Sequence, residues 1–60
     1  GGYKISVRAT PPYDASAICA QFGGGGHKGA AGCVIEDEKE TVKKRLAEAV
    51  SNYFRSQGIL

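Results

Sequence analysis

Hydrophobic and polar residues alternate at the start of the chain, from Tyr3 to Ala9. A period of two is typical of a strand with one buried face, so residues 3–9 are predicted to form a half-buried strand. A second apolar run, residues 30–35, ends in β-branched side chains and predicts another strand. The first strand has two faces: Tyr3, Ile5, Val7 and Ala9 on the apolar one, Lys4, Ser6 and Arg8 on the polar one.

A turn and a short helix are predicted between these strands. Two prolines in residues 10–13 fix φ and lack amide donors, which indicates a turn, and Asp14 can then cap a helix. Apolar residues recur at helical spacing from Ala15 to Phe22, so one stripe of this helix can pack on the strand. Gly23 suits the left-handed residue that ends a helix.

A longer helix is predicted over residues 38 to 56. Asp37 is its expected N-cap, with Glu40 in a capping-box relation, and Gly58 ends it. The fold class is therefore α/β, a small β-α-β-α unit with a short sheet covered by a short helix and a long C-terminal helix. This order favours a right-handed crossover between neighbouring parallel strands. The apolar stripe of the long helix consists of Val42, Leu46, Ala49, Val50, Tyr53 and Phe54.

The glycine run at residues 23–26 is predicted to be a loop that binds an anion. Glycine reaches positive φ and has no Cβ, so successive amides can converge on one oxyanion, and His27 and Lys28 follow directly as further donors. A dinucleotide-binding fingerprint needs a strand before it and a helix after it, which is the reverse of the order here. A Walker loop needs Gly-Lys-Ser/Thr, which is missing, and a flexible linker is the remaining alternative.

Charge and length limit the ligand and the setting. The 60 residues carry eight basic and six acidic side chains, and the excess of positive charge lies in the first 35 residues. This charge suits one or a few phosphates rather than the long footprint of a duplex. The longest apolar run is far below the ~20 residues that span a bilayer. We expect a cytoplasmic protein without a membrane partner, and a chain cut from a longer one with neighbours upstream.

The two cysteines indicate neither a disulfide framework nor a metal site. Cys19 and Cys33 show no C-x-x-C spacing, so buried free thiols are expected. A zinc site made from these thiols and His27 would need a fourth ligand and a known spacing, so no metal is expected in this chain.

Residues 23–32, GGGGHKGAAG, resemble the signature of the DHHA1 subdomain of DHH-family phosphoesterases. The resemblance extends to Ile5-Ser6-Val7-Arg8 and to the long helix, so residues 1–60 would form one substrate-binding domain, the C-terminal piece of a longer protein and part of a larger DHHA1 subdomain. It implies no catalytic residue here. The substrate would be held by Arg8, Gly24, Gly25, Gly26 and His27, with Lys28 as a further candidate.

The family resemblance also implies a function for the whole protein. A DHH catalytic domain in the same chain would hold manganese or another divalent metal and hydrolyse short oligonucleotides, nucleoside bisphosphates or single-stranded nucleic acid, as oligoribonuclease/pAp-phosphatase-like or RecJ-like enzymes do. The expected partners are a nucleotide or short oligonucleotide, the catalytic domain and, for the parent protein, a second copy. The alternative is a non-catalytic RNA-binding or oligomerisation module like the C-terminal region of alanyl-tRNA synthetases.

Overall fold

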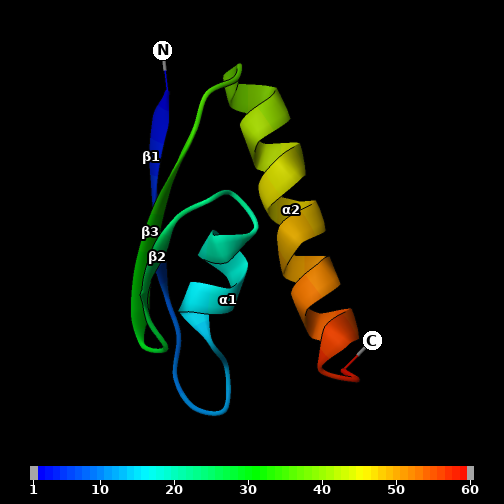
Figure 1. Cartoon of the computed structure of the whole chain (residues 1–60). Coiled ribbons are helices and arrows are strands. Elements are labelled where there is room, and N and C mark those ends of the chain that lie inside the picture. Colours follow the sequence, from blue (N-terminus) through cyan, green and yellow to red (C-terminus); the bar gives the residue numbers. More distant parts are fainter. Residues whose placement is uncertain (1, 60) are drawn as a thin grey trace.

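The computed structural model describes residues 2–59, and Figure 1 shows a single sheet with two helices packed beside it. The predicted α/β class is confirmed, as is the cover of a short helix and a long C-terminal helix. The chain forms five elements in the order β1 (Tyr3–Arg8), α1 (Ala15–Ala20), β2 (Gly25–His27), β3 (Ala30–Ile35) and α2 (Lys39–Ser56).

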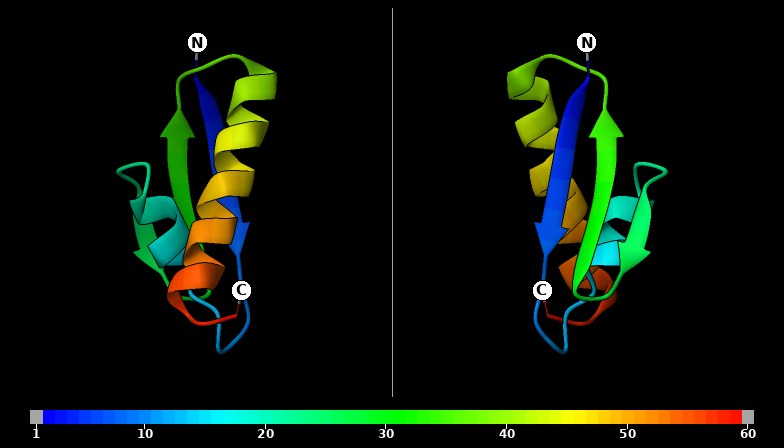
Figure 2. Two further views of the ribbon diagram at one scale, coloured as in Figure 1. Left: turned by 90° about the vertical axis from the view of Figure 1, so that its right-hand side faces the viewer. Right: turned by 90° about the vertical axis from the view of Figure 1, so that its left-hand side faces the viewer.

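The sheet has three strands in the order β1-β3-β2, and both outer strands run antiparallel to β3. The prediction that the strands at residues 3–9 and 30–35 lie parallel was therefore wrong. The reason is β2, a strand that the sequence analysis assigned to the glycine loop. Its hairpin with β3 reverses the chain, so β1 and β2 run in the same direction on either side of β3 (Figure 2, right).

Both helices cover the same face of the sheet, and the other face has no helix over it (Figures 1 and 2). This follows from the alternation in β1, where Ile5 and Val7 turn to the helices and contribute to the core. The predicted stripe of α2 is confirmed, since Val42, Ala49 and Tyr53 are buried. The core is completed by Ala15, Ile18, Cys19, Cys33 and Ile35.

The two helices begin differently. The side chain of Asp14 caps α1 as predicted, accepting hydrogen bonds from the amides of Ser16 and Ala17. The predicted cap of α2 was wrong, because Glu38 is the N-cap residue and makes no side-chain capping bond. Asp37 instead accepts a hydrogen bond from the amide of Glu38, since it lies one residue too early to reach into the first turn.

The ends of both helices follow the glycine prediction. Gly23 and Gly58 each have φ of +76°, a left-handed conformation that terminates a helix without the penalty a Cβ would bring. Residues 21–23 form a turn, so α1 is shorter than the predicted span to Phe22. Neither α1 nor α2 combines the length and apolar character needed to cross a membrane.

The thiols of Cys19 and Cys33 are free and buried, as expected. Burial raises the pKa of the Cys33 thiol, and the neighbouring Cys19 raises it further. A thiol with a raised pKa is a poor nucleophile, so the pair acts as part of the packing between α1 and β3.

Acid should destabilise the domain partly through Asp14. The hydrogen bond from the Ser16 hydroxyl is the largest cause that lowers the pKa of this carboxyl below its usual 3.8, with the capped amides and the charge of Lys28 acting in the same direction. A group with a lowered pKa in the folded state stabilises above its unfolded-state pKa and loses that contribution as pH falls through the folded value.

The melting temperature of the wild-type domain should therefore fall more steeply than that of Asp14→Asn below about pH 4, because asparagine caps a helix without titrating. Thermal unfolding monitored by circular dichroism over that range measures the difference. Parallel acid profiles for the two proteins would show that the cap makes no charged contribution.

Candidate functional site

The polar residues of β1 lie on the face of the sheet that neither helix covers (Figure 2). Strand pairing places Arg8 opposite Ala30 and Lys4 opposite Val34, and paired residues of antiparallel strands point to the same face. We call this surface the open face. It comprises Lys4, Ser6 and Arg8 from β1, Ala30, Gly32 and Val34 from β3, and Gly25 and His27 from β2.

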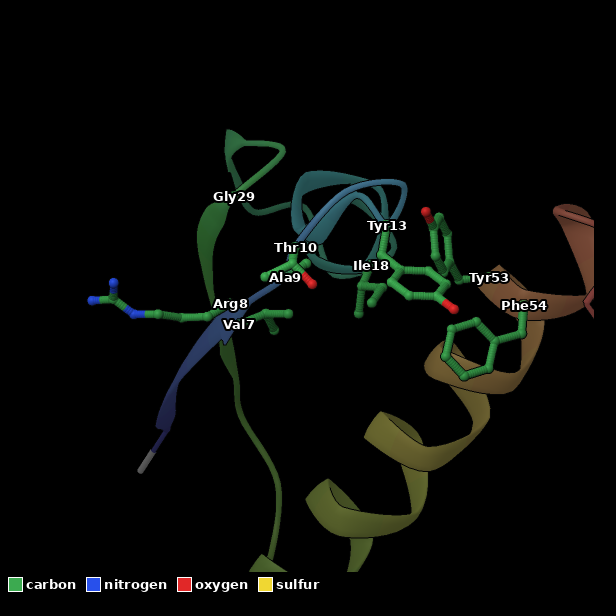
Figure 3. Close-up of a pocket in the computed structure, with 9 residues that line it drawn as sticks. All are labelled: Val7, Arg8, Ala9, Thr10, Tyr13, Ile18, Gly29, Tyr53 and Phe54. Atoms are coloured by element: carbon green, nitrogen blue, oxygen red, sulfur yellow. The ribbon is translucent and has the colours of Figure 1, made fainter.

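Arg8 and His27 lie in one row across the open face, with Ala30 between them. Two strand spacings separate their backbones by ~10 Å, a gap that the arginine and imidazole side chains can close over the small Ala30 methyl. Figure 3 shows the Arg8 side chain extending away from the side on which Val7, Tyr13 and Ile18 gather. The structure thus brings together two of the predicted site residues that are 19 positions apart in the sequence.

The turn between β2 and β3 fixes the position of His27. The amide of Gly29 donates a hydrogen bond of 3.2 Å to Nδ1 of His27, which leaves the proton of the neutral ring on Nε2. The carbonyl of Gly29 accepts from the amide of Ala9 (3.1 Å), and that of Lys28 accepts from the amide of Ala15 (2.8 Å). The end of β1 and the start of α1 therefore both hydrogen-bond to this turn and fix it in place. With Nδ1 occupied as an acceptor, His27 presents the N–H group of Nε2 as a donor.

Gly24 and Gly26 have no room for a side chain. A Cβ on Gly24 would overlap the carbonyl oxygen of Gly32, and one on Gly26 would lie 2.6 Å from that of Ala30. Gly26 also has φ of +149°, which L side chains rarely adopt. These glycines let β2 pack against β3, so residues 25–27 form a strand, and the prediction of a loop at this point was wrong.

Gly25 differs from its neighbours. A Cβ at Gly25 would meet nothing within 4 Å, and one at Gly32 would make only an ordinary contact with the carbonyl oxygen of Ile5. These two residues pair across β2 and β3 and form a flat part of the open face beside the row of Arg8 and His27. The packing of this domain therefore requires no glycine at position 25.

Lys28 does not extend the row. It lies in the turn after β2, and its charge contributes to the lowered pKa of Asp14 at the start of α1. The open face carries instead Lys4 and Ser6, which the sequence analysis did not include among the site residues. The signal was present, because the alternation in β1 had already placed them on the same side as Arg8.

The open face can bind an anion by charge and by hydrogen bonds. Lys4, Arg8 and His27 are exposed, and none of the ion pairs found within residues 2–59 involves them. A guanidinium and an imidazole N–H that face the same space are suitable donors to phosphate oxygens. No group of three or more metal-ligating side chains comes together within residues 2–59, so these residues do not fit manganese.

A scan against protein families matches residues 1–56 to the DHHA1 domain. The chain belongs to the DHHA1 domain family. DHHA1 domains are associated with DHH phosphoesterases, which supports the general kind of function expected from the sequence. A search of curated proteins and a search of solved structures each gave no match.

Substitution by alanine should distinguish the glycines that the packing of β2 on β3 requires from a glycine that lies only on the surface. Gly24→Ala and Gly26→Ala should destabilise the domain by about 1–3 kcal/mol or more, because each methyl overlaps the backbone of β3. A domain of this size rarely has more than ~3–5 kcal/mol of stability, so each variant should lose a large part of it. Denaturant unfolding and amide NMR spectra measure the effect.

Gly25→Ala is the matched control and should stay within about 0.5 kcal/mol of the wild type. Equal stability of all three variants would show that β2 does not pack against β3 in this way.

Proposed function

We propose that this chain is the substrate-binding domain of a DHH-family phosphoesterase and holds a nucleotide phosphate on the open face. The observation that carries the proposal is the row of Arg8, Ala30 and His27, in which two donors face one space on a sheet surface without a covering helix. Membership of the DHHA1 family supports the same function. The substrates would be short oligonucleotides, nucleoside bisphosphates or single-stranded nucleic acid.

In this function the chain binds and orients its substrate. The Arg8 guanidinium neutralises phosphate charge and can donate two parallel hydrogen bonds, while Nε2–H of His27 donates from the other side. Two contacts fix both the position and the rotation of the phosphate. Such positioning speeds a reaction by lowering the entropy lost on the way to the transition state. Divalent metal, which would activate water in the catalytic domain, has no ligand set among residues 2–59.

The catalytic domain would approach the open face, so that the substrate is enclosed between the two domains. The open face is the surface available for this approach, because both helices cover the other face of the sheet (Figures 1 and 2).

The sheet would continue beyond β1 in the larger subdomain. β1 is an edge strand of the described sheet, and a groove of about 520 Å³ beside its end is lined by apolar and aromatic side chains, among them Val7, Tyr13 and Phe54 (Figure 3). An unpaired edge next to apolar surface is suited to a further strand.

Hydrogen exchange tests this extension. Outward-pointing amides of β1 should be protected in the full-length protein and exchange rapidly in residues 1–60 alone. Rapid exchange in both proteins would show that no strand adds to this edge.

The alternative, an oligomerisation module, would need an apolar surface on α2. The stripe that could supply it is largely used within the domain, since Val42, Ala49 and Tyr53 are at most 5% exposed. Exposed Ile59 lies near the end of the chain, and Leu60 is outside the described residues. This packing favours substrate binding over helix-mediated association.

Replacing the two donors should weaken substrate binding without affecting the catalytic metal. In the intact protein, Arg8→Ala and His27→Ala should each weaken binding of a 5′-phosphorylated dinucleotide about 10- to 100-fold, the range expected when a charged hydrogen bond is lost. Calorimetric titration after removal of the metal by a chelator measures affinity without hydrolysis of the ligand, and metal analysis before that treatment checks that the catalytic domain is loaded.

Arg55→Ala is the control, because Arg55 is exposed on α2, on the covered side of the sheet. Unchanged affinity in Arg8→Ala and His27→Ala would contradict the proposed site.

A further inference from the structure

Lys4 lies on the open face four residues before Arg8. Four residues of strand separate their backbones by ~13 Å, and an even spacing turns both side chains to the same face. Lys4 is exposed and takes part in neither of the ion pairs found within residues 2–59. The ammonium group is therefore free to bind an anion at a position displaced along β1 from the row of Arg8 and His27.

A groove of about 510 Å³ adjoins Lys4. The groove is lined from the open face by Lys4, Ser6, Gly32 and Val34, from the segment before β2 by Gly23 and Gly24, and from the core side by Ile5, Phe22 and Cys33. Between Lys4 and Arg8 the open face has only the Ser6 hydroxyl and the glycines of β2 and β3, so neither a charge nor a large side chain separates the two cations. Val34, paired with Lys4, is an aliphatic side chain against which a nucleobase could pack.

We propose that Lys4 binds a second phosphate of a single-stranded oligonucleotide whose end phosphate is held by Arg8 and His27. This inference rests on the proposed function and narrows its substrate class to chains of several nucleotides. The occupant follows from charge complementarity: two cationic positions on one strand, separated by an uncharged path, match the repeating negative charges of a nucleic-acid backbone. A substrate with a single phosphate would leave Lys4 without a partner.

Glu36 limits the length of this path. A Cβ on Gly2 would lie 2.9 Å from Cγ1 of Val34 and 3.2 Å from Cγ of Glu36, so Glu36 lies next to Val34 at the far end of the open face. Its carboxylate would repel a phosphate beyond the one at Lys4. The open face then favours a short oligonucleotide.

Salt dependence and ligand length together test the role of Lys4. The full-length protein is titrated, with divalent metal removed by a chelator so that the ligand is not hydrolysed. The probes are 5′-phosphorylated oligoadenylates of increasing length from the mononucleotide, each at several sodium chloride concentrations. The variants are Lys4→Ala, Lys4→Arg and, as a control of equal charge change on α2, Lys44→Ala.

For the longer ligands, Lys4→Ala should reduce the slope of log K against log salt by about 0.7, the value for one lost contact with a single-stranded phosphate. Its slope for the mononucleotide should stay that of the wild type, and Lys4→Arg and Lys44→Ala should behave as the wild type throughout. Glu36→Gln should increase affinity only for ligands that extend past Lys4. The inference would be overturned if Lys4→Ala left the slope unchanged for every ligand. It would also be overturned if Lys4→Ala reduced the slope for the mononucleotide as much as for the longer ligands.

The Arg8→Ala variant in the same titration separates this inference from the proposed function. If Arg8→Ala binds every ligand more weakly while Lys4→Ala behaves as the wild type, the second phosphate contact is contradicted and the phosphate site at Arg8 is supported. If Arg8→Ala binds all ligands with wild-type affinity, the proposed phosphate site is contradicted, and so is the inference that rests on it.

Discussion

The close backbone contact between the glycine run and β3 is the constraint on which the rest of this structure depends. Gly24 and Gly26 have no space for a Cβ, and only their absence of side chains lets β2 form beside β3. Once β2 is in register, His27 lies opposite Ala30 and shares its row with Arg8. The pairing that stabilises the sheet therefore also assembles the candidate site, so a shift in the register of β2 would move His27 out of the row of Arg8.

The strand pairing also divides the sheet into two faces that differ in composition and burial. One surface packs against α1 and α2 and carries the apolar core, while the other exposes cations and small residues. The turn after β2 connects the two, because its carbonyls accept hydrogen bonds from the end of β1 and the start of α1. Tyr53 reinforces the same region from α2, since its hydroxyl accepts a hydrogen bond of 2.7 Å from the amide of Asp14.

Much of this arrangement could be predicted from the sequence. The alternation in β1, the helical stripe of α2, the cap at Asp14 and the helix-ending glycines each depend on local patterns, and each was confirmed. Two predictions failed: the N-cap of α2, which is Glu38 rather than Asp37, and the assignment of Gly25–His27, because glycine has low strand propensity and no side chain to show alternation. A strand of three residues depends on its neighbour rather than on its own sequence, and missing it also reversed the predicted direction of β3. The family resemblance named Arg8 and His27, but only the register shows that they share a row.

The glycines also have a consequence for how related sequences can diverge. Substitution at positions 24 and 26 is opposed by folding, whatever the domain binds, whereas position 25 is free of that demand. A glycine at position 25 keeps the open face flat beside Arg8 and His27, which favours a ligand that approaches this face closely. A relative that kept the fold but lost its ligand would therefore be expected to accept side chains at position 25 before positions 24 and 26.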